Sequence, residues 1–387
     1  MIKELYNTAR RETGIILTTP VYIICMVVLP LFVMVFFTTL MQQGQPDSMP
    51  VGIVDLDNTS TTRSMTRKLD AFQNTSIVAH YNSVDEARQA MQENKIYGFM
   101  YFPKGTTDRL LASRQPKISF YYSYTSLTAG ALLYKDMKTI ATLGSAGVGS
   151  KTMSAKGYTE RQIKTFLQPI AIDMHAVTNP WTNYNFYLST MLIPGCMLLF
   201  VFLITAYSFG TELKFGRAHK LLAAAGDDTW AMLLGKLLPQ TLIFLTMFYV
   251  YSFYVYGILG FPHEGGIWKI LLLGLLAVTS AQGFGAFMFG LMPSLRMSMS
   301  VCSLWAVLSF SLVGTAFPVF AMDTPLEGIA QLFPLRHYFR IYQTCVFNSF
   351  PLCYVWINIV AMLAFTLLPL LVADNIRKAM REYKYME

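Results

Sequence analysis

Long stretches without charge alternate with polar segments along this chain. No charged side chain occurs from Ile15 to Met41, and further apolar runs follow residue 185. A helix needs roughly 20 apolar residues to cross a hydrocarbon core of about 30 Å. The pattern therefore predicts an α-helical polytopic membrane protein with six transmembrane helices, at residues 14–41, 186–209, 231–257, 268–291, 298–318 and 352–373.

Residues 42–185 have a different pattern, in which short apolar runs of strand type alternate with helical ones. Strands are expected at residues 50–57, 76–81, 97–102 and 117–124, with helices between them and a mostly helical stretch from Ser126 to Ala171. Alternating strands and helices are typical of an α/β layer domain. The segment is long enough to bury a core of its own, so we expect an α/β domain inserted after the first span.

The distribution of basic residues orients the chain. The net charge is +8 although only 13% of residues are charged. Lys269, Arg336 and Arg340 lie in predicted outer loops, whereas many more basic residues flank the opposite ends of the spans: Lys3, Arg10, Arg11, Lys214, Arg217, Lys220, Lys236, Arg296, Arg377, Lys378, Arg381 and Lys384. Cytoplasmic loops carry such an excess. The charge therefore indicates topology and no nucleic-acid partner, with both termini cytoplasmic and residues 42–185 extracytoplasmic.

The two ends of the chain are expected to lie at the cytoplasmic membrane surface. Residues 1–13 have the spacing of a short amphipathic helix, which tends to lie in the membrane interface. The run that follows exceeds the usual signal-peptide core and ends without a small-residue cleavage site, so we predict an uncleaved span. Residues 374–387 form a basic tail that favours anionic membrane lipids.

Sequence motifs for bond chemistry are absent. The chain contains no G-x-x-x-x-G-K-[ST], G-x-S-x-G or H-E-x-x-H pattern and no C-x-x-C pair, so we expect no enzyme activity, no catalytic residue, and no cofactor or metal site. Charged residues are also nearly missing from the predicted spans, which disfavours ion pumps and proton-coupled carriers.

The segment 211–226 between the second and third spans is basic and amphipathic. It predicts one helix that stops at Gly226, after which Asp227 or Asp228 caps the next helix. Two interpretations remain open from the residues alone. The helix rests on lipid headgroups, or it is a coupling helix that docks in a groove of a soluble motor subunit.

This segment carries a family resemblance. The chain resembles ABC type-2 exporter permeases, in which an acidic residue, Gly-Thr, Leu-Leu, Thr-Pro and Gly-Lys recur in this order between spans two and three. The matching residues here are Glu212, Gly216, Leu221, Leu222, Gly235 and Lys236. The sequence departs from the family pattern at Arg217 and at Ala225-Gly226. The resemblance implies that Glu212, Gly216, Arg217, Leu221, Leu222 and Gly226 couple the chain to an ATPase.

A second match lies between spans five and six, at residues 317–350. The residues that fit the family pattern are Phe317, Pro318, Met322, Pro325, Pro334 and Leu335. In the family this segment forms short helices that enter the outer leaflet without crossing it, and such a segment must be buried in protein. An ordinary external loop is the alternative.

The resemblance extends over nearly the whole chain and implies a fold like that of type V ABC exporters. It implies a permease subunit in the bacterial inner membrane that moves an amphipathic or apolar substrate outward. ATP and Mg would be bound by separate ABC ATPase subunits. The other implied partners are a second permease copy or a homologous permease and, because of the large external domain, a periplasmic adaptor protein with an outer-membrane channel.

Two other functions remain to be weighed. A membrane-anchored receptor or adhesion protein would act through its external domain, but further spans are excessive for an anchor. An intramembrane enzyme would need converging nucleophiles, acids or bases. The predicted spans offer serines such as Ser280 and Ser303 without a histidine or carboxylate among them.

Overall fold

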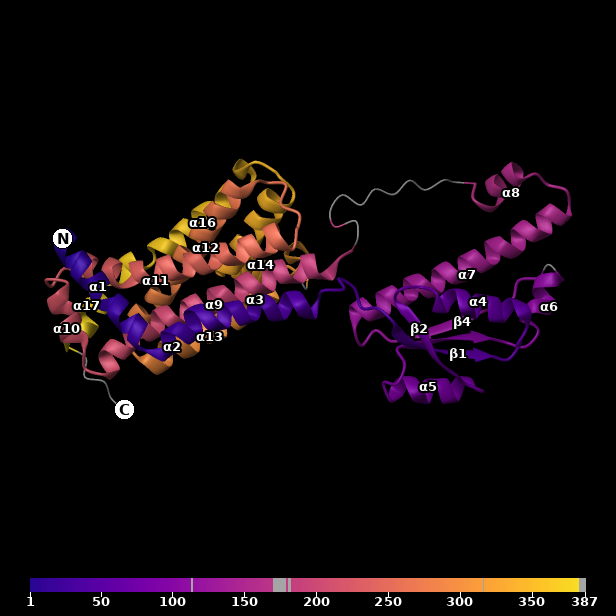
Figure 1. The fold of residues 1–387 in the computed structure, drawn as a ribbon, viewed down its shortest axis with the longest axis horizontal. Helices are drawn as coiled ribbons and strands as arrows, with labels where there is room; N and C mark the ends of the chain where they lie inside the picture. The colour runs from indigo at the N-terminus through magenta and orange to yellow at the C-terminus, as the bar shows by residue number, and fades with distance from the viewer. Residues whose placement is uncertain (113, 170–178, 180–181, 316, 383–387) are drawn as a thin grey trace. The chain divides into compact units, whose positions relative to one another are not determined.

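The computed structural model describes residues 1–112, 114–169, 179, 182–315 and 317–382. Lys384 and residues 170–171 of the predicted helical stretch lie outside the described residues. The chain forms two compact units. One comprises Met1–Gln42 with Tyr184–Glu387, and the other is Gln43–Asn183 (Figure 1).

The first unit is helical, and its described residues include six helices long and apolar enough to cross a membrane. These helices span Pro20–Leu40, Tyr184–Lys214, Thr229–Ile258, Ile267–Leu291, Leu295–Leu312 and Leu352–Glu382. Their number and order are those predicted from hydropathy. The chain is a multi-pass membrane protein.

These spans are built from the following elements. The first consists of α2 (Pro20–Ile23), a π-helical turn (Ile24–Val28) and α3 (Leu29–Leu40). Next come α9 (Tyr184–Lys214), α11 (Thr229–Ser252) with a π-helical end (Phe253–Ile258), α12 (Ile267–Leu291) and α13 (Leu295–Leu312). The last contains a 3₁₀ turn (Leu352–Val355), α16 (Trp356–Leu367) and α17 (Pro369–Glu382).

The N-terminal helix is longer than predicted. Helix α1 covers Ile2–Thr18, so it continues through the expected boundary at residues 13–14. The break comes at Thr19, which has an extended backbone (φ −106°, ψ 112°). Because proline disfavours helical geometry in the residue before it, Pro20 sets this boundary. The change from polar to apolar composition lies five residues earlier and does not end the helix.

The segment after α13 contains short helices. They are a 3₁₀ turn (Val319–Ala321), α14 (Thr324–Ala330), α15 (Pro334–Ile341) and a π-helical turn (Tyr342–Phe347). At 1.5 Å per residue each is far too short to cross a membrane. Helix α15 packs against α12 and α16. Of the residues singled out in the sequence, Pro334 and Leu335 are buried, Met322 is half-buried, and Phe317, Pro318 and Pro325 are exposed.

The second unit contains, among its described residues, a sheet of strand order β2-β1-β3-β4. Strand β1 (Met49–Asp55) pairs in parallel with β2 (Thr75–His80) and β3 (Gly98–Phe102), and β3 pairs antiparallel with β4 (Ser119–Tyr122). Each strand overlaps one of the short apolar runs at residues 50–57, 76–81, 97–102 and 117–124, with ends that differ by up to two residues. The helices of this unit are α4 (Ser60–Asp70), α5 (Val84–Gln92), α6 (Thr106–Leu111), α7 (Leu127–Ala155) and α8 (Glu160–Leu167).

Both faces of the sheet are covered. Helices α4 and α7 lie over one face and α5 over the other (Figure 1). Leu69 and Leu133 pack with Ile53 on the first face, while Ala87 packs with Phe99 on the second. Burial on both sides explains why β1 and β3 are nearly continuous apolar runs.

One carboxylate holds the loop between β3 and α6 in this unit. Asp57 Oδ1 accepts hydrogen bonds from the backbone N–H groups of Gly105 (2.8 Å) and Thr106 (3.1 Å), and Oδ2 accepts from the backbone (3.0 Å) and hydroxyl (2.7 Å) of Thr107. Partial burial opposes ionisation, but the hydrogen bonds from Thr107 and Gly105 outweigh it and lower the pKa of Asp57.

Asp57→Asn should therefore loosen the start of α6, because an amide nitrogen cannot accept the bonds from Thr107. We expect amide exchange at residues 105–107 to accelerate by at least about fivefold, the loss of roughly one net hydrogen bond. Exchange mass spectrometry on the full chain in detergent measures this. A lowered folded-state pKa means that wild type loses the same protection as the pH falls through that pKa.

Asp85, an exposed acidic residue in the first turn of α5, provides the control. Asp85→Asn should leave amide exchange at residues 105–107 unchanged. Unaltered exchange in Asp57→Asn would show that this loop is held by other contacts.

Candidate functional site

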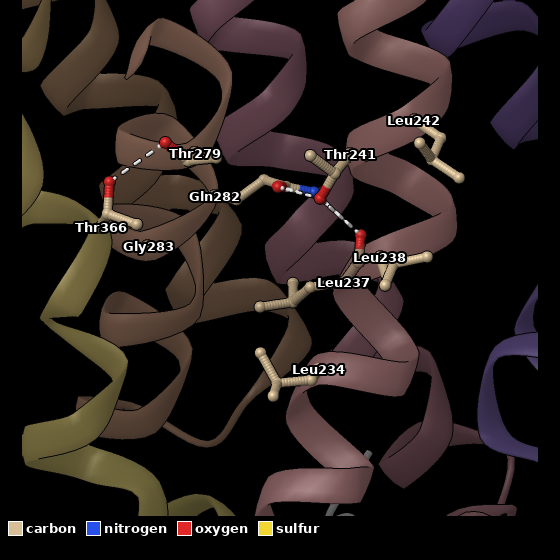
Figure 2. Close-up of a pocket in the computed structure, with 9 residues that line it drawn as sticks. All are labelled: Leu234, Leu237, Leu238, Thr241, Leu242, Thr279, Gln282, Gly283 and Thr366. Atoms are coloured by element: carbon tan, nitrogen blue, oxygen red, sulfur yellow. Dashed lines mark hydrogen bonds between the residues drawn. The ribbon is translucent and has the colours of Figure 1, made fainter. Parts of the chain in front are cut away.

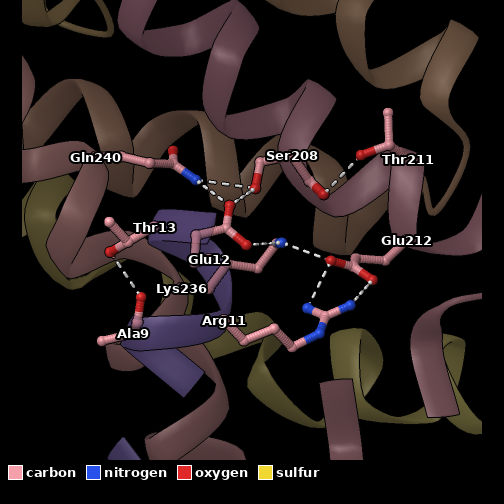
Figure 3. Close-up of polar contacts among 9 residues, drawn as sticks. All are labelled: Ala9, Arg11, Glu12, Thr13, Ser208, Thr211, Glu212, Lys236 and Gln240. Atoms are coloured by element: carbon pink, nitrogen blue, oxygen red, sulfur yellow. Dashed lines mark hydrogen bonds and ion pairs between the residues drawn. The ribbon is translucent and has the colours of Figure 1, made fainter. Parts of the chain in front are cut away.

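A buried polar cluster joins α1, α9 and α11 at one end of the helical unit. Its members are Arg11, Glu12, Ser208, Glu212, Lys236 and Gln240 (Figure 3). Glu12, Glu212 and Lys236 expose 0%, 2% and 1% of their surface. Such burial of charged groups is rare unless they are paired.

Lys236 is the centre of this cluster. Its Nζ donates to Glu12 Oε2 at 2.7 Å and to Glu212 Oε1 at 3.0 Å. The ammonium therefore bridges a carboxylate on α1 and one on α9 from its own position on α11. Helices far apart in the sequence are joined through one cation.

Arg11 completes the charge balance. Its guanidinium binds Glu212 in a bidentate manner, with donor–acceptor distances of 2.9 Å and 2.8 Å. Burial works against the charged form of Arg11, but the hydrogen bonds to Glu212 outweigh it and raise the pKa of Arg11. Two cations and two carboxylates leave the cluster neutral.

Neutral polar groups satisfy the remaining carboxylate oxygen. Glu12 Oε1 accepts from Ser208 Oγ at 2.8 Å and from Gln240 Nε2 at 3.1 Å. Gln240 Nε2 also donates to Ser208 Oγ at 2.8 Å. Hydrogen bonding of this kind is required for a buried carboxylate to stay charged.

The backbones of α1 and α11 approach closely beside the cluster. A Cβ on Gly235 would lie 2.6 Å from Thr8 Cβ and 3.0 Å from the carbonyl oxygen of Leu5. Only glycine fits this contact. The position of Gly235 next to Lys236 thus places the ammonium within reach of Glu12.

The segment 211–226 does not form the single helix predicted from the sequence. Helix α9 continues to Lys214, a turn follows, and α10 covers only Ala218–Ala224. The break is at Gly216, whose φ of +60° lies in the left-handed region that favours glycine. The predicted stop at Gly226 is confirmed, also with φ +60°, and the Asp228 side chain caps α11 by accepting from Trp230 N.

The residues proposed for coupling divide between the interior and the surface. Glu212 and Leu221 are buried, Arg217 and Leu222 are half-buried, and Gly216 and Gly226 are exposed. The exposed side chains around α10 are different ones: Lys214, Phe215, His219, Lys220 and Ala223. Lys214 and Lys220 were predicted only as basic residues at the ends of spans, and Phe215, His219 and Ala223 were not predicted as site residues. The spacing of His219, Lys220 and Ala223 away from the buried Leu221 is the signal that could have identified the exposed side of α10.

A basic and aromatic surface results. Phe215 is 60% exposed, with the guanidinium of Arg217 5.0 Å and the ammonium of Lys214 5.8 Å from its ring centroid. We call Lys214, Phe215, His219, Lys220 and Ala223 the α10 surface. Beneath it, Leu221 packs with residues of α9, α11, α12 and α17.

The C-terminal helix fixes the loop after α10. Arg377 donates to the carbonyl oxygen of Asp227 at 3.0 Å, and Arg381 pairs with the Asp227 carboxylate. Helices α1, α10 and α17 lie together at this end of the helical unit (Figure 1). The α10 surface is therefore a rigid projection from several helices.

Comparison with known proteins gives one family. The family described as ABC-2 family transporter protein matches residues 20–373 of the chain. A search of curated proteins gave no match.

Removing the central cation should destabilise the helical unit. Lys236→Met leaves Glu12 buried without a cation, so we expect the free energy of unfolding to fall by about 3–5 kcal/mol. Denaturant unfolding of the purified chain in detergent measures the loss. The exposed Lys220→Met serves as a matched control and should stay within about 0.5 kcal/mol of wild type.

Adding Glu12→Gln to Lys236→Met should restore much of this stability, because the uncompensated carboxylate is gone. If the double variant is as unstable as Lys236→Met alone, the ion pair is not the source of the loss.

Proposed function

The chain belongs to the ABC-2 family of transporter proteins, and we propose that it is the permease subunit of an ATP-driven exporter in the bacterial inner membrane. In this proposal the fold is that of type V ABC exporters with an inserted α/β domain. Separate ABC ATPase subunits bind ATP and Mg. The permease performs no bond chemistry and pairs with a second copy or a homologous permease.

The observation that carries the proposal is the geometry beside α10. The α10 surface projects from the ends of the spans, and the buried cluster lies directly behind it through Glu212 on α9. A soluble motor that pushes on α10 would move α9, α11 and α1, because α10 packs against all three. The bonds of Lys236 and Arg11 to Glu212 would keep these helices in register.

The cluster also explains why α1 belongs to the coupling apparatus. Helix α1 is separated from its own span by the break at Thr19, so covalent continuity transmits little movement. Its rigid attachment is to α9 and α11 through Arg11 and Glu12. ATP-driven closure of the motor pair would thus move the three helices as one body, which is the rigid-body class of switching.

Charge orients the proposed transporter. Basic residues of α10 and α17 lie at the same end of the helical unit as α1 (Figure 1), which by the positive-inside rule is the cytoplasmic side. Residues 42–185 would then lie outside, where a periplasmic adaptor protein with an outer-membrane channel is the proposed partner. Amphipathic or apolar cargo fits spans that contain few charged residues.

Substitution of the α10 surface should break the ATPase contact without harming the fold. We expect Phe215→Ala with Lys220→Glu to reduce co-purification of an ABC ATPase by at least about tenfold, since aromatic and charged residues at interface centres dominate binding. The measurement is affinity purification of the tagged chain with quantitative mass spectrometry. The free energy of unfolding should stay close to that of wild type because both side chains are exposed.

Lys104→Glu, an equal charge change on an exposed residue of the other unit, should retain the ATPase and serves as the control. An ATPase retained by the Phe215 and Lys220 double variant would show that the motor docks elsewhere. A wild-type preparation without any ATPase after cross-linking would contradict the exporter proposal itself.

A further inference from the structure

Helices α11, α12 and α16 enclose a groove on the side of α11 away from the buried cluster. Its volume is about 290 Å³, near the lower limit of small-molecule sites. The walls are the leucines Leu234, Leu237, Leu238 and Leu242 (Figure 2). Leu234, Leu238 and Leu242 are among the exposed apolar residues, so the groove opens on the lipid-facing side of these spans.

The inner side of the groove is polar. Thr241 Oγ1 donates to Gln282 Oε1 at 2.6 Å and thereby joins α11 to α12. Thr366 Oγ1 donates to Thr279 Oγ1 at 3.2 Å and joins α16 to α12. These four side chains line one wall together (Figure 2).

This polar wall lies deep in the membrane. Thr241 lies within three residues of the middle of the span Thr229–Ile258, and Thr279 is the central residue of the span Ile267–Leu291. Because a span of this length is centred on a hydrocarbon core of about 30 Å, the wall lies near its midplane. Phospholipid headgroups do not reach that depth, and an alkyl chain makes no use of hydroxyl and amide groups there.

The wall retains hydrogen-bonding capacity. Gln282 exposes only 3% of its surface, and its Nε2 donates one long hydrogen bond to Leu237 O at 3.3 Å. An amide nitrogen has two donors and a hydroxyl oxygen has two lone pairs. Gln282 and Thr241 can therefore each serve a further partner in the groove. None of the nine lining residues is charged.

We propose that this groove binds a neutral amphiphile, an alkyl chain carrying one hydroxyl or amide group, whose polar group hydrogen-bonds to Thr241 and Gln282. It is cargo entering from the bilayer, an assignment that rests on the proposed export function. The leucines bind the chain. Phospholipids and charged amphiphiles are disfavoured by the depth and by the uncharged lining.

The groove and the buried cluster lie on two different faces of the same helix, α11. Leu234, Leu237, Leu238 and Thr241 form one stripe of this helix, whereas Lys236 and Gln240 belong to the stripe that faces α1 and α9. One rigid helix thus carries the ligand groove on one face and the ion-pair cluster on another. A ligand in the groove would therefore contact the helix that the proposed motor moves.

Photolabelling of the purified full chain in phosphatidylcholine nanodiscs tests the groove. The probe is a long-chain primary alcohol with a diazirine in its chain, and the comparison is the alkane with the same diazirine. We expect the alcohol to label residues 234–242 preferentially. Thr241→Val with Gln282→Leu should lower that labelling by about fivefold for each hydrogen bond lost and leave alkane labelling unchanged, which also shows that the variant is folded.

Thr246→Val is the matched control, because Thr246 is an exposed threonine of α11 outside the groove that bonds only its own helix. Its labelling should equal that of wild type. Equal labelling by alcohol and alkane, or an unchanged pattern in the Thr241 and Gln282 double variant, would overturn the inference.

The exporter proposal and the groove proposal can be refuted independently of each other. Labelling needs no ATPase, so specific labelling of a chain that binds no ATPase would keep the groove and refute its role in export. An ATPase that binds a chain without specific labelling would keep the exporter and refute the groove.

Discussion

The constraint on which the α1 end of the helical unit depends is the compensation of buried charge. Glu12 and Lys236 are almost completely buried, and either one alone would be costly in this environment. They are tolerated because α1, α9 and α11 meet where Arg11, Glu212 and Lys236 can pair. The ion pairs therefore add to the close packing of α1 on α11 and join both helices to α9.

This arrangement determines how a force on the α10 surface would reach the spans. A seven-residue helix has little rigidity of its own, yet α10 packs on the ends of α9, α11, α12 and α17. Arg377 and Arg381 hold the loop that follows it. Force applied to the surface would be received by the ends of several spans and by α1, which also packs against α10. On the other face of α11, a ligand in the proposed groove would contact the same body.

The sequence predicted the spans well because the thickness of the bilayer sets the length of an apolar helix that crosses it. Apolar runs of that length are directly visible in the hydropathy of the chain. It located the central strands β1 and β3 of the second unit for the same kind of reason, since burial on both faces leaves nearly continuous apolar runs. It failed where one residue outweighs composition: Pro20 shifted the first boundary to Thr19, and Gly216 broke the predicted helix 211–226. Glu12 gave no local signal because its partners lie 196, 224 and 228 residues away. Lys236 did give one, since a cation inside a predicted span demands a carboxylate partner, but it was interpreted only as a topology charge and as the lysine of the family's Gly-Lys pair.

The central claim is that α1, α9 and α11 move as one body when the motor binds ATP. The most direct test is the distance between spin labels on the exposed positions Tyr6 of α1 and Trp230 of α11, measured by pulsed electron paramagnetic resonance in the complete complex with and without trapped nucleotide. A label at Lys378 of α17, an exposed residue outside the α10 surface, paired with its equivalent in the proposed second permease copy reports the motor stroke in the same samples. The account predicts a shifted Lys378 distance and an unchanged Tyr6–Trp230 distance. A Tyr6–Trp230 distribution that lengthens or splits on nucleotide binding would contradict it.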